Sequence, residues 1–385
     1  MTMGQSPKRR RAQNRFNILI IRPDRLGDVL LSTPVFAAVK AHYPNSHVSI
    51  LVPENVAPLL RGLSSVDEVL IYDPKKNHKG FRGFFLLVEQ LKARNFRIAI
   101  VLQSSWRVAL ATLFAKIRYR IGPLSKIHSF LTYNRGIRQN RSRVEYHEAD
   151  YNLQLLRRLG LRTSTRRFAT QVHVSAEEQA SVDQWLAERS VQSGDTLLAI
   201  HPGMGGSALN WPEQHYIDLL KALLREGKKV LLTGGPTEKD LVERVARASG
   251  GSPLIYVNTG KDSLQFLAGL YTRCALVVAP STGPLHLATA VGCAVVTFYP
   301  PIRVQSAVRW GPYMAQDQLA GVLVPEVYCG EEYKCRGSVC HHFPCMKGIT
   351  VNQALEEVQV RLSHKMANLV SAQLSEKNQE TEVKM

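Results

Sequence analysis

Short apolar runs alternate with longer stretches of helical periodicity along most of the chain. In the first half, each run holds four to six residues and is rich in Ile, Leu and Val, which predicts β-strands. The intervening stretches place apolar residues at helical spacing. Such alternation is typical of a parallel sheet covered by helices on both faces. We predict strands at 17–22, 48–52, 69–72 and 98–102, and helices up to about 42, at 84–94 and at 106–115.

The same alternation returns after an interruption between about 160 and 195. The segment 162–171 has little periodicity, and Ser175-Ala-Glu-Glu178 is a capping box that opens a helix through Arg189. Trp211-Pro-Glu213 then opens a helix, with Pro at an early position where its missing N–H is tolerated. We predict strands at 196–201, 229–233, 276–279 and 295–299, and helices at 211–227 and 285–291.

Two separate β/α halves indicate an α/β protein with two Rossmann-like, doubly wound domains that face a cleft. A chain of 385 residues also exceeds what one hydrophobic core usually serves. A second capping box, Thr350 with Gln353, opens a last helix, and the polar sequence after it is expected to be disordered. The predicted divisions are a disordered basic tail (1–16), a first domain (17–172), a second domain (173–349), a helix (350–370) and a disordered tail (371–385).

The formal net charge is +18, from 49 Lys and Arg against 31 Asp and Glu, and it is unevenly placed. From Lys116 to Arg143 the chain has eight basic residues and no acid. Nucleic acid, an anionic membrane surface or a phosphorylated substrate would each fit such a charge, as would a solvated basic face without a partner. Near an anionic membrane, each basic residue contributes about 1 kcal/mol.

The first residues are basic, but the apolar run Ile18–Ile21 that follows is too short for a signal peptide. No run approaches 18 consecutive apolar residues, which excludes a membrane-spanning helix. We therefore expect a cytoplasmic protein that can associate by charge with the inner face of the cytoplasmic membrane.

The six cysteines fall into two groups. Cys274 and Cys293 have apolar neighbours and are expected in the core. The others lie within the segment 329–345 beside two histidines, without the paired C-x-x-C of a zinc ribbon, so that metal binding is a weak prediction and redox-active thiols stay open. These four are Cys329, Cys335, Cys340 and Cys345.

Three loops that follow predicted strands could carry chemistry, since ligands of parallel sheets bind beyond the carboxyl ends of the strands. The first, Arg22-Pro-Asp-Arg-Leu-Gly-Asp28, ends in a carboxylate that can accept a proton from a hydroxyl. Capping of the next helix is the alternative role for Asp28.

The second loop, Ser281-Thr-Gly-Pro-Leu-His286, opens a helix whose amides can bind a diphosphate, or it is a plain helix cap. The third, His201–Ser207, has glycines that allow close approach of a ligand, and Trp211 below it is expected to be a core anchor.

The chain contains no Asp-x-Asp motif, which argues against a transferase that holds a diphosphate through a carboxylate-bound metal. The sequence therefore predicts no metal at the diphosphate and no other cofactor. A helix N-terminus must then stabilise the diphosphate, as the second loop can.

The R-L-G-D-V-L-L-S-T-P core of residues 18–44 resembles the opening of the family 9 glycosyltransferases, founded on the ADP-heptose:lipopolysaccharide heptosyltransferases. The resemblance recurs in order at His201-Pro-Gly, Asn210-Trp-Pro, 232–238 and 281–286, and covers roughly residues 17–310. It implies an inverting, metal-independent GT-B transferase that moves a heptose from ADP-heptose to the inner core of lipopolysaccharide.

The resemblance also implies roles for single residues and domains. Asp28 would be the catalytic base. The first domain would bind an anionic glycolipid acceptor, and the second the nucleotide sugar. The acceptor-binding residues would be Gln103, Ser104 and Arg25. The donor-binding residues would be Arg22, Gly203, Met204, Glu238, Ser281, Thr282, Gly283 and His286.

Two positions depart from the family pattern. Leu209 stands where heptosyltransferases commonly have Lys or Arg, and Ser281 stands where they have Asp. A different nucleotide-sugar donor or glycan acceptor on the same fold is therefore an alternative. A basic nucleic-acid-binding protein is an alternative of another class, although the chain has no recognised nucleic-acid motif and its aromatic residues are not interleaved with the basic run. A dehydrogenase is disfavoured because no G-x-G-x-x-G follows the first strand.

Overall fold

The structure is a computed structural model that describes residues 16–161, 168–192, 194–206, 208–260 and 263–383, and side chains up to 367. The chain forms two compact units. One comprises Met1–Ser142 and Tyr146–His173, and the other comprises Arg143–Glu145 and Val174–Met385. The division after His173 lies one residue from the predicted boundary. The short segment Arg143–Glu145 groups with the second unit, which no sequence pattern indicates.

The first unit contains a five-stranded parallel sheet in the order β3-β2-β1-β4-β5. Its central strand β1 is an apolar run with its last four residues buried, as a strand covered on both faces requires. The order reverses between β1 and β4, which makes their carboxyl ends the topological switch point. The strands are β1 (Asn17–Ile21), β2 (His47–Val52), β3 (Glu68–Ile71), β4 (Phe96–Val101) and β5 (Tyr119–Ile121).

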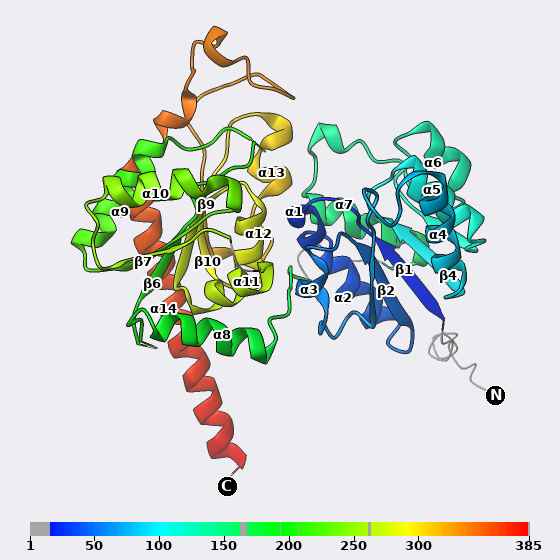
Figure 1. The fold of residues 1–385 in the computed structure, drawn as a ribbon, viewed down its shortest axis with the longest axis horizontal. Helices are drawn as coiled ribbons and strands as arrows, with labels where there is room; N and C mark the ends of the chain where they lie inside the picture. Colours follow the sequence, from blue (N-terminus) through cyan, green and yellow to red (C-terminus); the bar gives the residue numbers. More distant parts are fainter. Residues whose placement is uncertain (1–15, 162–167, 193, 207, 261–262, 384–385) are drawn as a thin grey trace, which may run out of the picture. The chain divides into compact units, whose positions relative to one another are not determined.

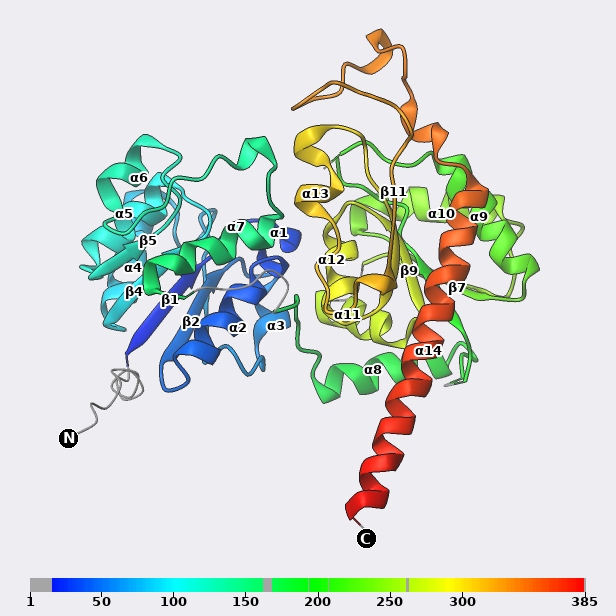
Figure 2. The same cartoon turned by 180° about the vertical axis from the view of Figure 1, so that it is seen from behind.

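Helices cover both faces of this sheet (Figure 1). On one face, Leu19 and Ile21 of β1 pack in a cluster with Leu87 of α4 and Val108 of α5. On the other face, α2 and α7 pack together and cross the sheet, as Figure 2 shows. The helices are α1 (Leu26–Leu30), α2 (Thr33–His42), α3 (Ala57–Leu60), α4 (Gly80–Lys92), α5 (Trp106–Phe114), α6 (Ile127–Thr132) and α7 (Glu148–Gln154).

The second unit repeats the scheme with a six-stranded parallel sheet in the order β11-β10-β9-β6-β7-β8. Its order reverses between β6 and β9, so the loops after these two strands meet at a second switch point. The strands are β6 (Leu197–Ile200), β7 (Lys229–Thr233), β8 (Ile255–Asn258), β9 (Leu276–Pro280), β10 (Ala294–Phe298) and β11 (Ala320–Leu323). The helices are α8 (Ala176–Ala187), α9 (Glu213–Arg225), α10 (Lys239–Ala248), α11 (Leu264–Arg273), α12 (Gly283–Ala290), α13 (Ala307–Trp310) and α14 (Val351–Val383).

Several local predictions for the second unit are confirmed. The capping box of Thr350 and Gln353 is complete, with the Gln353 amide N–H donating to the Thr350 hydroxyl at 3.2 Å and the Thr350 N–H donating to Gln353 Oε1 at 2.8 Å. Ser175 caps its helix by accepting the amide N–H of Glu178 at 3.2 Å, while the Glu178 carboxylate accepts from the Ser263 hydroxyl. Trp211 is buried, stacks on Phe298 with ring centroids 4.3 Å apart, and donates its indole N–H to a backbone carbonyl. Cys274 and Cys293 are both buried.

The last helix does not end where the sequence analysis placed its end. Helix α14 continues from Val351 to Val383, so the prediction of a disordered tail from 371 is wrong for the residues up to 383. Residues 351–383 contain no Gly or Pro and are rich in Ala, Leu, Glu, Gln and Lys, which are good helix formers. The predicted basic tail lies almost wholly outside the described residues, but Phe16 belongs to the folded unit, since its ring packs against Tyr43. In the described part of the chain, no helix is both long and apolar enough to cross a bilayer.

Candidate active site

Arg22 ends the central strand of the first sheet and is almost fully buried, with its side chain 2% exposed. Its Nε donates to Asp24 Oδ1 at 2.8 Å, and its Nη2 donates to Asp28 Oδ1 at 2.5 Å. Its Nη1 donates to Glu148 Oε1 at 3.3 Å and to Asn152 Oδ1 at 3.2 Å, both on α7. Every nitrogen of the guanidinium therefore faces a protein acceptor.

The predicted role of Arg22 as a donor ligand stays untested, and this geometry speaks against it. A guanidinium that is buried and saturated by protein acceptors has no free edge for a phosphate. Burial alone would lower the pKa of Arg22, but Asp24, Asp28 and Glu148 outweigh it and raise that pKa further above its ordinary range. Arg22 is a permanent cation that positions the carboxylates around it.

Asp28 is the third residue of α1 and is not its N-cap, which is Arg25. The alternative role of Asp28 as a helix cap is therefore not supported. Its side chain is 20% exposed, and Arg22 fixes Oδ1. Among the described residues, no hydrogen bond engages Oδ2, so this oxygen can accept a proton from a substrate hydroxyl. The Arg25 side chain is exposed beside it, which leaves its predicted contact with the acceptor as a prediction.

Two further members of this cluster were not predicted as site residues. Glu148 is buried and accepts hydrogen bonds from Arg22 and from Arg141, so two cations share one carboxylate. Asn152, one helical turn later, accepts from Arg141 at 3.1 Å and donates to the Ser32 hydroxyl at 3.2 Å. Helix α7 therefore holds Arg22 and Arg141 in place at the end of β1.

Asp24 belongs to the same loop as Arg22 and Asp28, and the sequence alone predicts no role for it. Burial raises its pKa from 3.8 to about 6, against the opposing effect of Arg22, and Asp28 and Glu148 add to the rise. Between pH 4 and 6 the folded protein therefore binds this proton more tightly than the unfolded chain, and the contribution of Asp24 to stability falls as the pH rises through that window.

The titration of Asp24 predicts a pH dependence of catalysis. When the pH falls through about 6, Asp24 is protonated and Arg22 is left to pair with fewer carboxylates. Its full charge then acts on Asp28, the predicted base, and holds that carboxylate more tightly, so kcat/KM should decrease on the acid side. Asp24→Asn mimics the protonated form at every pH and should be several-fold slower at pH 8, without an inflection near pH 6. A pH profile of both proteins tests this, and an inflection that persists in Asp24→Asn would contradict it.

A polar pocket of about 430 Å³ lies beside the cluster, within the first unit. It includes the predicted acceptor residues Gln103 and Ser104, at the end of β4, and two cations, Lys126 and Arg141. Arg141 joins the pocket to the carboxylate cluster through Glu148. A pocket with these two cations suits an acceptor that carries phosphates or carboxylates.

The Ser104 hydroxyl itself is engaged within the protein. It lies 2.8 Å from His128 Nε2, 3.1 Å from Ser129 Oγ and 2.8 Å from the Tyr133 hydroxyl. These contacts use the whole hydrogen-bonding capacity of a hydroxyl, so its side chain anchors α6 to the end of β4. Gln103, which is exposed in the pocket, is the better candidate for an acceptor contact.

The loop after β9 in the second unit has the form expected of an anion site. Thr282 is the N-cap of α12, and no side chain of the described structure caps the amides of its first turn. The Thr282 hydroxyl instead donates back to the carbonyl of Pro280 at 3.2 Å. The plain capping role is therefore not observed, and the Gly283 end of the helix remains available for an anion. His286 is buried within α12, and the predicted phosphate contacts of Ser281, Thr282, Gly283 and His286 stay predictions.

The loops after β6 and β7 meet at a buried network. His201 lies 3.0 Å from the Thr233 hydroxyl through Nδ1 and 3.5 Å from Glu238 Oε2 through Nε2. Burial lowers the pKa of His201 to about 4, and Glu238 offsets only part of this effect, so the imidazole is neutral at pH 7. Glu238 also accepts the backbone N–H of Gly235 at 2.8 Å. The network fixes Glu238 beside Gly203, while the predicted contacts of Gly203, Met204 and Glu238 with the nucleotide are not tested.

A glycine is required at position 203 for the Glu238 side chain to lie so close to the backbone, because a Cβ there would collide with the Glu238 carboxylate. Gly203→Ala should therefore displace Glu238. Because Glu238 is predicted to contact the nucleotide, this change should weaken nucleotide binding about as much as Glu238→Ala does. The double variant should be little weaker than either single variant, since the two changes remove one contact. Titration calorimetry with the nucleotide measures this, with Gly194→Ala, which has open space, as the control. Additive losses would show that Gly203 and Glu238 act separately.

The four clustered cysteines, Cys329, Cys335, Cys340 and Cys345, are all free and partly exposed. Burial raises the pKa of Cys345, and the neighbouring Cys335, Cys329 and Cys340 add to the rise. Within the described ranges, no group of three or more His, Cys, Asp or Glu residues is arranged to hold a metal ion. The weak prediction of a metal at these cysteines therefore gains no support from the geometry.

Comparison with known proteins identifies the family to which this chain belongs. The family model described as glycosyltransferase family 9 (heptosyltransferase) matches residues 84–337. The chain belongs to glycosyltransferase family 9. It is 34% identical over 301 residues to a candidate glycosyltransferase of Haemophilus influenzae, covering 77% of this chain and 85% of that protein. It is 26% identical to lipooligosaccharide heptosyltransferase 2 of the same organism, covering 75% of this chain and 84% of that protein.

Solved structures confirm the fold of a family 9 enzyme. ADP-heptose lipopolysaccharide heptosyltransferase II of Escherichia coli superimposes with a TM-score of 0.73 at 23% identity, covering 91% of this chain and 99% of that chain. A family 9 glycosyltransferase from Veillonella parvula superimposes with a TM-score of 0.78 at 20% identity, covering 91% and 98%. The protein is therefore a glycosyltransferase of the GT-B architecture, with two Rossmann-like units.

Proposed function

We propose that this family 9 enzyme transfers a heptose from ADP-heptose to a sugar hydroxyl of the lipopolysaccharide inner core, with inversion and without a metal. The observation that carries the proposal is the Asp28 carboxylate. It is fixed on one oxygen by a buried Arg22, is partly exposed, and lies in the same unit as a pocket lined by Lys126 and Arg141. A charged, phosphorylated glycolipid acceptor matches the cations of that pocket.

The proposed reaction is a single displacement. Asp28 Oδ2 takes the proton of the acceptor hydroxyl, whose oxygen forms a bond to the anomeric carbon as the bond to the diphosphate breaks. Negative charge then develops on the leaving diphosphate, and the amides at the start of α12 stabilise it. Arg22 holds Asp28 in a fixed orientation, so little rearrangement is needed during the reaction.

The names of the relatives support this choice of substrates. Several curated relatives are named lipopolysaccharide or lipooligosaccharide heptosyltransferases, from Haemophilus influenzae, Salmonella typhimurium and Escherichia coli. A solved structure with a TM-score of 0.68 is titled as the E. coli heptosyltransferase WaaC with ADP. The relative at 34% identity is named without a sugar, so the identity of the heptose rests on the more distant ones.

A second candidate function, transfer from another nucleotide sugar on the same fold, is favoured by one observation. Leu209 and Ser281 replace a commonly basic and a commonly acidic residue of the heptosyltransferase pattern, and both lie in the unit that holds the proposed donor loops. An altered donor site would keep the fold and Asp28 but change the nucleotide or sugar.

The melting temperature of the purified protein with ADP, UDP, GDP or CDP tests the choice of donor. A ligand at 100 times its dissociation constant stabilises a folded protein by about 2.7 kcal/mol, which is a measurable shift. We expect ADP to raise the melting temperature and the other three to have little effect. A shift with UDP, GDP or CDP alone would replace the donor, and no shift with any nucleotide would contradict the assignment of the donor loops.

A further inference from the structure

Helices α4, α5 and α6 of the first unit expose an unusual number of large apolar side chains. Nine of the nineteen large hydrophobic residues that are exposed in the described chain lie on these three short helices. The most exposed are Ile127 (84%), Leu131 (79%) and Phe81 (78%). Scattered apolar residues are normal on a surface, but a continuous group marks a site of interaction.

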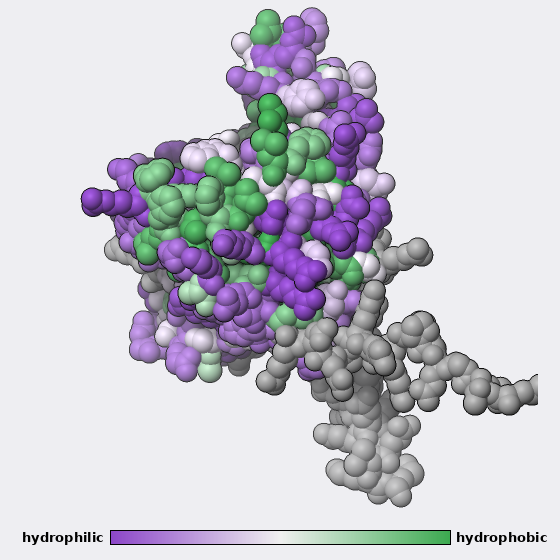
Figure 3. All heavy atoms as spheres, turned by 90° about the vertical axis from the view of Figure 1, so that its right-hand side faces the viewer, coloured by the Kyte–Doolittle hydropathy of each residue, from purple (hydrophilic) through white to green (hydrophobic). Residues whose placement is uncertain are grey.

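These side chains form one continuous surface. Helix α5 packs against α4 on one side and α6 on the other. The ring of Phe81 lies 4.9 Å from that of Phe85, and the ring of Phe84 lies 5.4 Å from Phe85 and 5.9 Å from Phe114 of α5. Figure 3 shows this side of the unit, where hydrophobic side chains gather and hydrophilic ones border them. We call the outward side chains of α4, α5 and α6 the docking face.

The docking face is not needed for the core of the unit. The inner side of α4 already packs on the sheet through Leu87, Val88 and Leu91. On α6, Ile127, Phe130 and Leu131 share the outward side at spacings of three and four, while Ser129 is buried on the inward side. A helix in water normally has the reverse arrangement, so the outward apolar residues indicate an environment other than water.

Basic residues border the docking face. Arg82 follows Phe81 on α4, Lys116 closely follows Phe114, and Lys126 immediately precedes Ile127. Residues 74–144 contain sixteen Lys and Arg and a single acid, Glu89. An apolar surface with a basic border is the pattern of a protein that lies on an anionic bilayer, where long basic side chains reach the headgroups.

This pattern favours lipid over the other partners of such a surface. A second copy of the chain would bring one basic border against another, with like-charge repulsion. Nucleic acid would satisfy the charges and could stack on the exposed aromatic rings, but it would leave the aliphatic side chains of Ile127 and Leu131 in water. An anionic bilayer satisfies both the charge and the apolar side chains.

We propose that the docking face binds the surface of an anionic membrane, with its apolar side chains between the lipid chains and its basic border on the headgroups. The inference goes beyond the proposed function and needs no knowledge of the donor. It also places the acceptor pocket next to the docking face within one unit, because Ser104 and Lys126 of the pocket lie just before α5 and α6. The sugars of a glycolipid could then enter the pocket while its lipid stays in the membrane.

Co-sedimentation of the full chain with vesicles tests this proposal. We expect binding to vesicles of phosphatidylglycerol and phosphatidylethanolamine, little binding to phosphatidylcholine alone, and weakening by salt. The double variant Ile127→Glu/Leu131→Glu should bind at least tenfold more weakly, because charge replaces the most exposed apolar side chains. Arg82→Gln/Lys116→Gln should reduce binding between about fivefold and 30-fold, since each cation contributes about 1 kcal/mol.

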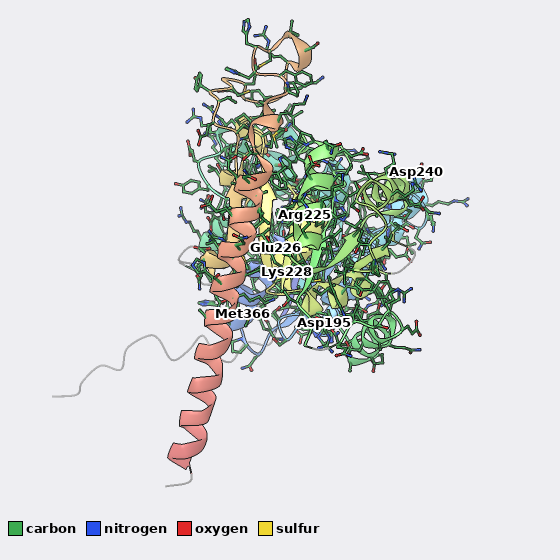
Figure 4. The ribbon with its side chains drawn as sticks, turned by 90° about the vertical axis from the view of Figure 1, so that its left-hand side faces the viewer. Asp195, Arg225, Glu226, Lys228, Asp240 and Met366 are labelled. Carbon is green, nitrogen blue, oxygen red and sulfur yellow. The ribbon has the colours of Figure 1, made fainter. Side chains whose placement is uncertain are left out.

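Two controls keep the test decisive. Met366→Glu changes another exposed apolar residue, which is 63% exposed on α14 of the second unit (Figure 4), and it should bind vesicles like the wild type. Phe81→Gln serves as a second docking-face variant if the α6 variant unfolds, as judged by its melting temperature. The proposal would be overturned if the wild-type protein did not bind anionic vesicles. It would also be overturned if both docking-face variants, once shown to be folded, bound these vesicles as well as the wild type does. A dimer that the α6 variant dissociates, without any vesicle binding, would instead assign the face to a second copy.

Discussion

Replacing Asp28 with Ala or Asn should lower kcat by between about 100-fold and 10,000-fold, the range that a positioned general base contributes. Asp28→Asn is the sharper variant, because it keeps the size of the side chain and an oxygen that can accept from Arg22, and it removes only the basicity. The nucleotide affinity should stay near normal, since the proposed donor loops belong to the second unit. Initial rates at saturating donor, with the dissociation constant of ADP measured separately, test both parts.

Asp24→Asn is the matched control for this variant, because it lies in the same loop and contacts the same guanidinium. It should be only several-fold slower at pH 8, since Asp24 modulates the base and does not take the proton. An Asp28→Asn enzyme that keeps a tenth of the wild-type rate would remove Asp28 from the role of base. Equal losses in the two variants would assign the effect to the charge of the cluster instead.

Replacing Arg22 with Met should destabilise the first unit by about 3–5 kcal/mol, the usual cost of removing one partner from a buried ionic network. Asp24, Asp28 and Glu148 would remain near one another without their shared cation. For a unit of this size, the melting temperature should fall by roughly 10 °C. The loss should be smaller at pH 5 than at pH 8, because the crowded carboxyl groups can then take up protons.

The exposed neighbour Arg25 provides the comparison for Arg22. Arg25→Met changes the same residue type in the same loop, and surface changes of this kind usually alter stability by no more than about 0.5 kcal/mol. Thermal unfolding of the two variants followed by circular dichroism measures the difference. Equal melting temperatures for Arg22→Met and the wild type would mean that the network does not stabilise the unit as its geometry indicates.

The fold could be predicted well where strands are central to a sheet. Strands such as β1, β6 and β9 are covered on both faces, so their sequences are unbroken apolar runs that the pattern reveals directly. The strands β5, β8 and β11 were not predicted, and all three lie at the edges of their sheets. Edge strands are short and need less apolar sequence; β5, for example, is only Tyr-Arg-Ile.

The site was predictable only where local sequence carries it. Asp28 and the loop at 281–286 could be proposed as site residues because a Gly-Asp pair and a small-residue turn follow apolar strands. Glu148 could not, because an acid in the polar sequence of α7 looks like a solvated residue, and only its distant partner Arg22 explains its burial. One signal was available: Glu148 and Asn152 lie one helical turn apart and next to the apolar Ala149 and Leu153, which indicates that they share the buried side of the helix. The burial of Arg22 could not be predicted for the same reason, since it depends on these tertiary partners.

The most direct test of the proposed reaction is incubation of the purified enzyme with ADP-heptose and a heptose-deficient inner-core acceptor, with the product examined by mass spectrometry and NMR. We expect release of ADP, a gain of one heptose on the acceptor, and inversion at the anomeric carbon, in the presence of a metal chelator. Transfer that requires a divalent metal, or a product formed only from a different nucleotide sugar, would contradict the account.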